Sequence, residues 1–142
     1  MTDDAAALSA QDDSILEQIA DAVVYSDRAG TIRRWNRAAE GLFGHAAAEA
    51  LGRSLDLIIP EPLRAAHWRG FNAAVASGVT RLDGRPALTR AVHASGRRLY
   101  VEMSFALVRD GAGEVVGSVA VARDVTERTE QQKARQGNAT ST

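Results

Sequence analysis

The sequence predicts an α+β fold, with a five-stranded antiparallel sheet that carries short helices on one face and helical segments at both ends. Two observations lead to this prediction. Extended stretches gather near the start and in the second half of the chain, and short helical stretches lie between them. The regular strand–helix alternation of a parallel sheet is missing, as are the GxGxxG and GxxxxGK[ST] phosphate loops.

The N-terminal part predicts a polar segment and then a short helix. Residues 1–12 offer little to bury and are expected to be disordered or loosely helical. Asp13 or Ser14 can cap a helix in which apolar residues recur at every fourth position. These residues are Ile15, Ile19 and Val23.

A hairpin and a capped helix are expected next. Extended runs over residues 23–26 and 31–35 are joined by Asp27–Gly30, a sequence typical of a turn. Asn36 and Gly44 then stand where the N-cap and the C-terminal stop of a helix belong. The helix between them is predicted to run from residue 37 to residue 43.

Two more helices and three strands complete the predicted domain. The helices span residues 46–51 and about 60–76, the latter with prolines in its first turn, where they are tolerated. Two long strands meet at the turn 94–97. In the second of these, alternate residues from Leu99 to Leu107 are apolar, which predicts that one face lines a core. A last strand is predicted over residues 114–123.

From Val125 the chain is rich in charge and predicts an exposed helix that leaves the domain. The expected organisation has three parts: a loosely structured start, one domain, and a helical stub with a frayed tail. Their boundaries are residues 1–12, 13–125 and 126–142. The length of 142 residues fits one domain and a short exit helix.

Composition excludes several function classes. The absence of cysteine excludes disulfides, thiolate metal sites, thiol nucleophiles and cysteinyl-flavin photochemistry. Lysine and arginine number 17 against 18 aspartate and glutamate, so no basic excess points to nucleic acid. No apolar run approaches the ~20 residues that span a bilayer, and the acidic start does not resemble a signal peptide. We expect a cytoplasmic protein that is not an enzyme, since no nucleophile elbow, HExxH or paired-carboxylate motif occurs.

The sequence resembles a PAS domain over roughly residues 13 to 130. The motif N-x-A-A-E-x-L-F-G occupies residues 36–44, and E-x-L-G-R-x-L follows at 49–55. The closing stretch 113–132 contains the motif D-[IV]-T-E-R, which in that family hands over to a signalling helix. Asp124 and Thr126 of this motif are expected to anchor the exit helix to the sheet and to cap it.

The segment IIPEPLRAAHWRGF, residues 58–71, is similar to a segment of the haem-binding PAS domains in FixL oxygen-sensor kinases and direct-oxygen-sensor phosphodiesterases. This resemblance makes His67 the proximal ligand of haem iron. Independently, Leu63 and Phe71 lie one helical turn before and after His67, so its imidazole is expected to face inward. A lone inward histidine suits a macrocycle better than zinc, although it can also be a core or interface residue.

On the other side of the expected cofactor this sequence departs from those sensors. Ala87 falls where FixL-like sensors have the arginine that contacts bound oxygen, and Arg85 falls where the phosphodiesterase type has a methionine. Positions 85 and 87 are expected to share a strand face, so Arg85 can take the role of either group; the alternative is an exposed strand arginine. Met103 is expected as cavity wall or sixth ligand, and Phe105 as core.

The favoured hypothesis is a sensory PAS module that binds haem b and responds to dioxygen, carbon monoxide, nitric oxide or redox state through its C-terminal helix. The alternatives are a cofactor-free dimerisation or interaction module and, less favoured, a PAS domain with non-covalent FAD. We expect a homodimer that signals to an unidentified protein or domain. The residues expected at the cofactor are His67, Leu63, Phe71, Arg85, Ala87, Val101, Met103, Phe105 and Val119.

Overall fold

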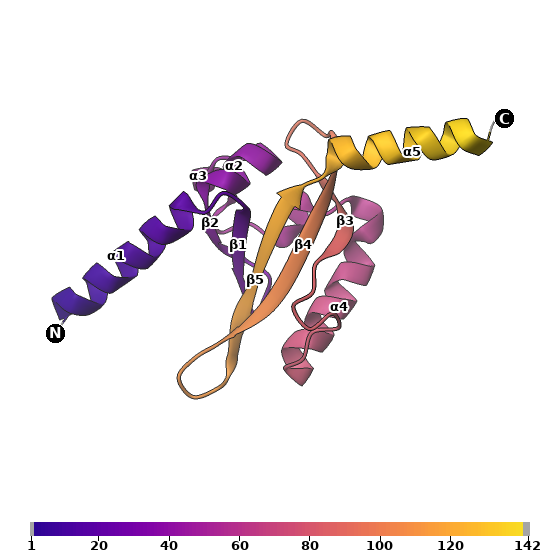
Figure 1. Cartoon of the computed structure of the whole chain (residues 1–142). Coiled ribbons are helices and arrows are strands. Elements are labelled where there is room, and N and C mark those ends of the chain that lie inside the picture. The colour runs from indigo at the N-terminus through magenta and orange to yellow at the C-terminus, as the bar shows by residue number, and fades with distance from the viewer. Residues whose placement is uncertain (1, 141–142) are drawn as a thin grey trace.

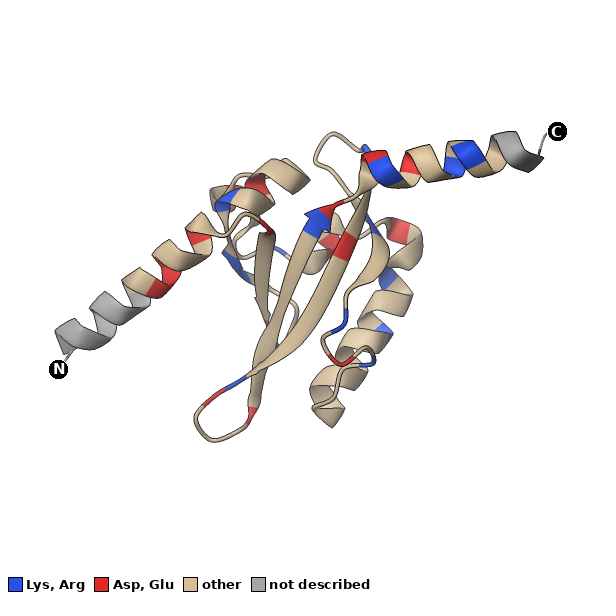
Figure 2. Cartoon of the chain, in the orientation of Figure 1, with Lys and Arg blue, Asp and Glu red and all other residues tan. Residues whose placement is uncertain are grey.

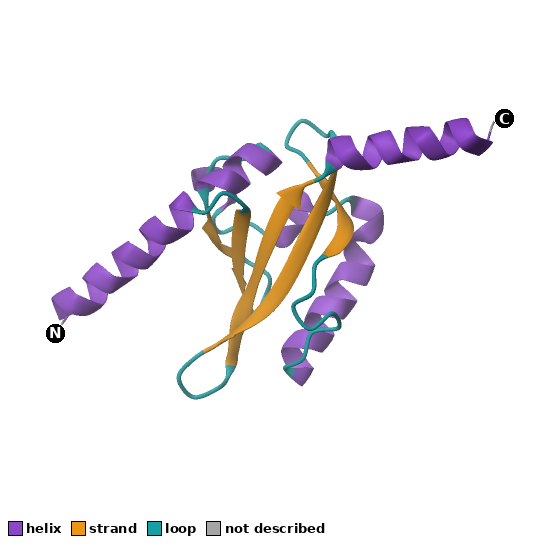
Figure 3. Ribbon diagram, in the orientation of Figure 1, coloured by secondary structure: helices purple, strands orange, loops and turns teal. Residues whose placement is uncertain are grey.

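The computed structural model describes the backbone of residues 2–140 and the side chains of residues 10–137. A five-stranded antiparallel sheet has the strand order β2-β1-β5-β4-β3, which confirms the predicted α+β fold (Figures 1 and 3). The strands are β1 (Ala22–Asp27), β2 (Ile32–Trp35), β3 (Ala87–Val92), β4 (Arg98–Arg109) and β5 (Val115–Asp124). The α-helices are α1 (Thr2–Gln18), α2 (Arg37–Phe43), α3 (Ala47–Ala50), α4 (Arg64–Ser77) and α5 (Thr126–Thr140). Two 3₁₀ helices are η1 (Leu55–Ile58) and η2 (Glu61–Leu63).

The strand register divides the sheet into an inner face, which the short helices cover, and an outer face. Val24 lies opposite Ala120, and Ala120 lies opposite Phe105, so these three side chains share the inner face. Their neighbours along each strand point to the outer face because side chains alternate with a period of two. The inner face meets the helices in one core, where Phe43 and Leu99 are fully buried.

Asn36 joins the first helix, the first strand and α2. Its Oδ1 accepts hydrogen bonds from the backbone N–H groups of Ala39 at 3.0 Å and Val23 at 2.9 Å. Its Nδ2 donates to the carbonyl oxygens of Leu16 at 2.8 Å and Asp21 at 3.1 Å. The predicted N-cap is therefore confirmed, and the same side chain also fixes how the chain enters β1.

The first helix differs from the prediction. It begins at Thr2, so Asp13 and Ser14 do not cap it; the Ser14 hydroxyl donates instead to the carbonyl of Ala10 at 3.0 Å. The expected apolar face is also wrong, because Ile19 follows the helix and Val23 belongs to β1. The alanine-rich stretch upstream favours helix without needing a packed face, which explains the earlier start.

The short helix η1 was not predicted. Ser54 caps it, since the Ser54 hydroxyl accepts a hydrogen bond from the backbone N–H of Asp56 at 3.1 Å. Leu55 and Ile58 of η1 enter the core. A single 3₁₀ turn is too short to produce a helical period in the sequence, so only its serine cap could have indicated it.

Charge is distributed unevenly over the fold. Figure 2 shows that the strands are mostly uncharged along their middle and that both signs of charge alternate along α5. Neither sign dominates one face in this view, in keeping with the net charge of −1. Among the described residues, no helix is long and apolar enough to cross a membrane.

Candidate ligand cavity

A cavity of about 430 Å³ lies between α4, the 3₁₀ helices and the inner face of the sheet. This volume falls within the range of small-molecule sites in proteins, about 300–1,000 Å³. Most lining residues are apolar, and His67 is the titratable side chain that α4 contributes. The residues around the cavity are Val24, Ser26, Leu55, Ile58, Ile59, Leu63, Ala66, His67, Leu82, Ala87, Leu88, Thr89, Arg90, Ala91, Met103, Phe105, Ser118 and Ala120.

His67 is half-buried on α4 within an aromatic cluster. Its ring lies edge-on to Trp68, with centroids 4.7 Å apart, and stacks on Phe71 at 5.9 Å. Burial lowers the pKa of His67 below its usual range, and the negative charge of Asp56 opposes this shift only in part. The imidazole is therefore neutral at pH 7, the form that binds metals.

The ring nitrogen Nδ1 of His67 is buried and has no hydrogen-bond partner among the described residues. A buried polar atom without a partner is unusual in a folded protein and asks for an explanation. A histidine that ligates a metal ordinarily donates from its second nitrogen to an acceptor, and the described residues offer none to Nδ1. The ring is consequently held by packing against Trp68 and Phe71.

The position of α4 is fixed by its contacts with η1. The indole Nε1 of Trp68 donates to Asp56 Oδ1 at 2.7 Å. Arg64 donates from Nε to the carbonyl of Ile59 at 3.0 Å and from Nη2 to the carbonyl of Asp56 at 3.3 Å. These three bonds hold the helix against η1, so His67 is placed by both elements rather than by α4 alone.

The sheet supplies the opposite wall of the cavity. Met103 and Phe105 come from β4, and Ala120 from β5, all on the inner face. Two serines interrupt this apolar wall. Ser26 on β1 and Ser118 on β5 lie directly opposite one another, with their hydroxyl oxygens 3.2 Å apart.

Five of the residues expected at the cofactor line this one cavity: His67, Leu63, Ala87, Met103 and Phe105. Two others lie in the core beside it. Phe71 is buried and stacks on His67, and Val101 is fully buried on the inner face of β4. Thus α4 and β4 bring most of the expected residues together.

The remaining two predictions, Arg85 and Val119, require correction. β3 begins only at Ala87, so Arg85 lies in the preceding loop, where its Nε donates to the carbonyl of Leu82 at 3.0 Å. It is exposed and does not share a strand face with Ala87. Val119 points to the outer face because it alternates with the inward residues Ser118 and Ala120.

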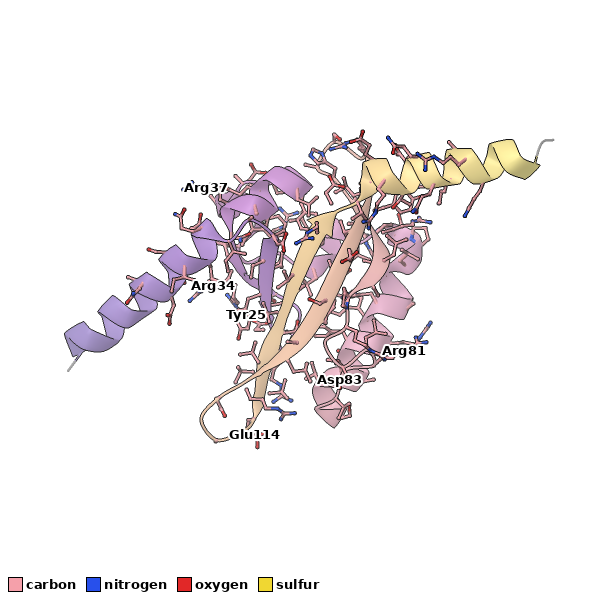
Figure 4. All side chains as sticks on the ribbon, viewed as in Figure 1. Tyr25, Arg34, Arg37, Arg81, Asp83 and Glu114 are labelled. Atoms are coloured by element: carbon pink, nitrogen blue, oxygen red, sulfur yellow. The ribbon has the colours of Figure 1, made fainter. Side chains whose placement is uncertain are left out.

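The loop between α4 and β3 contributes Leu82 to the lining of the cavity. Arg81 and Asp83, which flank Leu82, are labelled in Figure 4 beside the lower part of α4. Asp83 has a φ of +50°, and Gly84 has a φ of +78°. This turn delays the start of β3 and accounts for the misplaced Arg85.

Sequence reasoning missed the two serines and the η1 residues of the cavity. In β5, Ser118 occupies a position in the same alternating series as Ala120 and Ala122, where an apolar residue is expected. Ser26 interrupts the series of β1 in the same way. A small polar residue at an inward-facing strand position was therefore the sequence feature that could have indicated these two serines.

Among the described residues, no group of three or more histidine, cysteine, aspartate or glutamate side chains could hold a metal ion. The cavity instead offers one neutral imidazole and apolar walls. This donor set fits a haem, in which the porphyrin supplies four ligands and the protein needs to supply one.

The exit helix is attached to the sheet through Tyr100 of β4. The Thr126 hydroxyl accepts a hydrogen bond from the backbone N–H of Tyr100 at 2.9 Å, and the N–H of Val125 donates to the Tyr100 carbonyl at 2.9 Å. Asp124 Oδ1 accepts from the N–H of Thr126 at 2.9 Å. The predicted anchoring role is therefore confirmed for Thr126, and the predicted capping role for Asp124, which bonds the first N–H of α5.

Further along α5, Lys133 Nζ donates to the Tyr100 hydroxyl at 2.7 Å and lies 4.5 Å from the centre of its ring. The Lys133 hydrogen bond is the main reason that the pKa of Tyr100 is lowered. Arg128 lies 3.5 Å from Glu102 in an exposed ion pair. The helix is therefore attached to β4 at its start and again two turns later.

Comparison with known proteins places this geometry in a family. The family model described as "PAS fold" matches residues 16–130. The sensor protein FixL of Bradyrhizobium diazoefficiens is 43% identical over 54 residues, which cover 38% of this chain. The chain spans 16% and 11% of the lengths of the first two curated relatives that it matches.

Two solved structures share the fold. A PAS domain from Colwellia psychrerythraea has a TM-score of 0.72 at 21% identity, and the alignment covers 84% of this chain and 98% of that one. An RNA-binding light-oxygen-voltage receptor also has a TM-score of 0.72, at 27% identity, over 96% of this chain and 38% of that one.

Proposed function

Because the chain belongs to the PAS family, we propose that it is a sensory module whose cavity binds haem b through His67 and responds to a diatomic gas or to redox state. The observation that carries this proposal is a neutral histidine on α4 at the wall of an otherwise apolar cavity. The similarity of residues 58–71 to the histidine segment of haem-binding PAS domains supports it.

Each wall of the cavity has a separate part in this proposal. His67 would supply the imidazole nitrogen that holds the iron, and its place is set by the Trp68–Asp56 bond. Leu63, Met103 and Phe105 would cover the porphyrin and exclude water. When bound, haem would supply an iron centre that binds gases or changes oxidation state.

The route from cavity to output runs along β5. Ser118 and Ala120 of β5 line the cavity, and the same strand ends at Asp124, where the Tyr100–Thr126 attachment of α5 begins. A cavity ligand that favours one packing of this strand would shift the position of α5, provided that it binds the two packings with different affinity.

The test is the visible spectrum of the purified protein after haem is added. We expect a Soret band that moves on reduction and on addition of carbon monoxide, and that disappears in His67→Ala. His93→Ala is the matched control, because His93 lies at the β3–β4 turn and is not among the residues that line the cavity. A protein that stays colourless with haem overturns the proposal and leaves the cofactor-free interaction module.

A second candidate is non-covalent binding of FAD. It is favoured by the likeness, at 27% identity, to the light-oxygen-voltage receptor. With no cysteine in the chain, a thiol adduct with the flavin is excluded, so any flavin would be bound without a covalent bond. A flavin spectrum in the purified protein, in place of a Soret band, would select this candidate.

A further inference from the structure

We propose that the hydroxyl groups of Ser26 and Ser118 form the hydrogen-bond donor site of the cavity, for a neutral diatomic ligand that would bind near the sheet wall. The inference rests on the proposed haem binding and adds the residues that would recognise the gas. Arg85, expected in this role, is exposed in a loop and does not line the cavity.

The two serines stand on the wall that faces α4. Their exposed fractions are 1% for Ser26 and 3% for Ser118, and both residues line the cavity. The side chains beside them on the inner face are apolar, Val24 on β1 and Ala120 on β5. The pair is therefore a buried polar spot with apolar neighbours on its own two strands, where a hydrogen bond to a ligand is not weakened by competing water. Thr89 and Arg90, which also line the cavity, come from β3, two strands away from β5.

Close contact between β1 and β5 holds the pair in place. A Cβ added at Gly117 would lie 2.1 Å from the carbonyl oxygen of Ser26, so only glycine allows this approach. The two serines are direct partners across the antiparallel pair, which fixes the separation of their Cβ atoms. The donor site is thus built before a ligand arrives.

The pair has a hydrogen to offer to the cavity in one of the two directions of the Ser26–Ser118 bond. Two hydroxyls carry two hydrogens, and the bond between Ser26 and Ser118 uses one of them. If Ser118 donates to Ser26, the Ser26 hydrogen can reach the carbonyl of Asp27 over a long 3.3 Å. If Ser26 donates to Ser118, the Ser118 hydrogen is left for the cavity, because the described residues give that hydroxyl no partner other than Ser26.

The pair suits a neutral ligand atom, because among the described residues no charged side chain lines the cavity next to it. Arg90, the charged residue around the cavity, comes from β3, which β4 separates from β5 in the sheet. His67 is neutral at pH 7 and lies on α4 rather than on the sheet wall. A small acceptor such as the oxygen atom of carbon monoxide or dioxygen matches a single hydroxyl donor.

The experiment uses the haem-loaded protein with carbon monoxide and dioxygen as probes. Ser118→Ala is expected to raise the C–O stretching frequency, because a hydrogen bond to the ligand oxygen lowers it. The same change is expected to speed dioxygen dissociation by about two- to tenfold, the effect of losing one neutral hydrogen bond. Ser26→Ala is expected to have a smaller effect, since it removes only the group that orients Ser118.

Ser104→Ala is the matched control, because Ser104 lies opposite Val121 on the outer face of the adjacent strand. It is expected to leave both readouts unchanged. A merely structural role for the pair predicts instead that Ser118→Ala lowers the melting temperature of the haem-free protein and leaves the C–O frequency at its wild-type value. That result overturns the inference.

The outcomes separate this inference from the proposed function. A wild-type Soret band that His67→Ala abolishes, together with an unchanged C–O frequency in Ser118→Ala, overturns the serine site alone. The absence of any haem complex overturns both proposals. A frequency that rises in Ser118→Ala and not in Ser104→Ala supports both.

Discussion

His67 combines burial with a titratable ring, so its protonation is coupled to folding. Its pKa is lowered in the folded protein from the usual 6.5, mainly by burial. Above that value the ring is neutral in both states. As the pH falls below about 6.5, the unfolded chain takes up the proton first, and the folded state loses stability until the pH passes its own lower pKa.

We predict that the wild-type protein without haem is less stable to urea at about pH 5.5 than at about pH 7.5, and that His67→Gln reduces this difference. His93→Gln, at the β3–β4 turn, is the matched control and should retain the wild-type pH dependence. The same loss of stability on acidification in His67→Gln as in the wild type would contradict the prediction.

For single residues, the sequence predicted which side chains face inward where helical spacing or strand alternation decides it. The i−4 and i+4 neighbours of His67 and the alternation along β4 located Leu63, Met103 and Phe105 correctly. The pairing of Ser26 with Ser118 could not be predicted, since it depends on the register of strands 92 positions apart in the chain. Local periodicity carries no information about such a register.

Among the elements, the contact of α4 with the β1–β2 hairpin is the most sensitive to a small change. Gly30, in the hairpin turn, has a φ of +81°, and a Cβ there would lie 2.2 Å from the Trp68 ring. The ring cannot easily move, because it packs on His67 and Phe71 and donates to Asp56.

We predict that Gly30→Ala destabilises the protein more than Gly96→Ala. Both residues have positive φ, which costs about 1–2 kcal/mol for a side chain with a Cβ. Only Gly30 also displaces Trp68, which adds about 1–3 kcal/mol for overpacking, whereas nothing lies within 4 Å of a Cβ at Gly96. Free energies of unfolding in denaturant test this, and equal losses in the two variants would refute it.

Elements were predicted most accurately where a capping residue and the spacing of apolar residues mark the same boundary. Helix α2 has both its Asn36 cap and its Gly44 stop, and it was predicted over its true range. The start of α1 was missed because polar caps at Asp13 and Ser14 suggested a boundary that helix propensity overrides. The start of β3 was missed because the turn at Asp83 and Gly84 depends on positive φ, which neither residue type demands.

For the whole molecule, the position of α5 depends on few contacts. Its second point of attachment is the Lys133 ammonium, which donates to the Tyr100 hydroxyl and lies near the face of that ring. Most other side chains in the second half of the helix are exposed. Losing this contact should free the far end of α5 while the Thr126 attachment stays.

We predict that Lys133→Met speeds amide hydrogen exchange in residues 130–137 by a factor of a few, with little change in β4 or in the cavity strands. Arg135→Met, which also replaces an exposed cation on α5, should exchange like the wild type. Unchanged exchange in Lys133→Met would show that the helix is held by its first turn alone.

The fixed spacing of two residues on the central strand β5 decides where this domain can tolerate an inserted residue. Ser118 must face the cavity, and Asp124 must present α5 to Tyr100, while six positions separate the two residues on one strand. One residue inserted between them would turn one of these two sites to the wrong side of the sheet. An insertion in the hairpin at residues 110–113 would leave both residues in register, so chain length can vary there without separating the cavity wall from the exit helix.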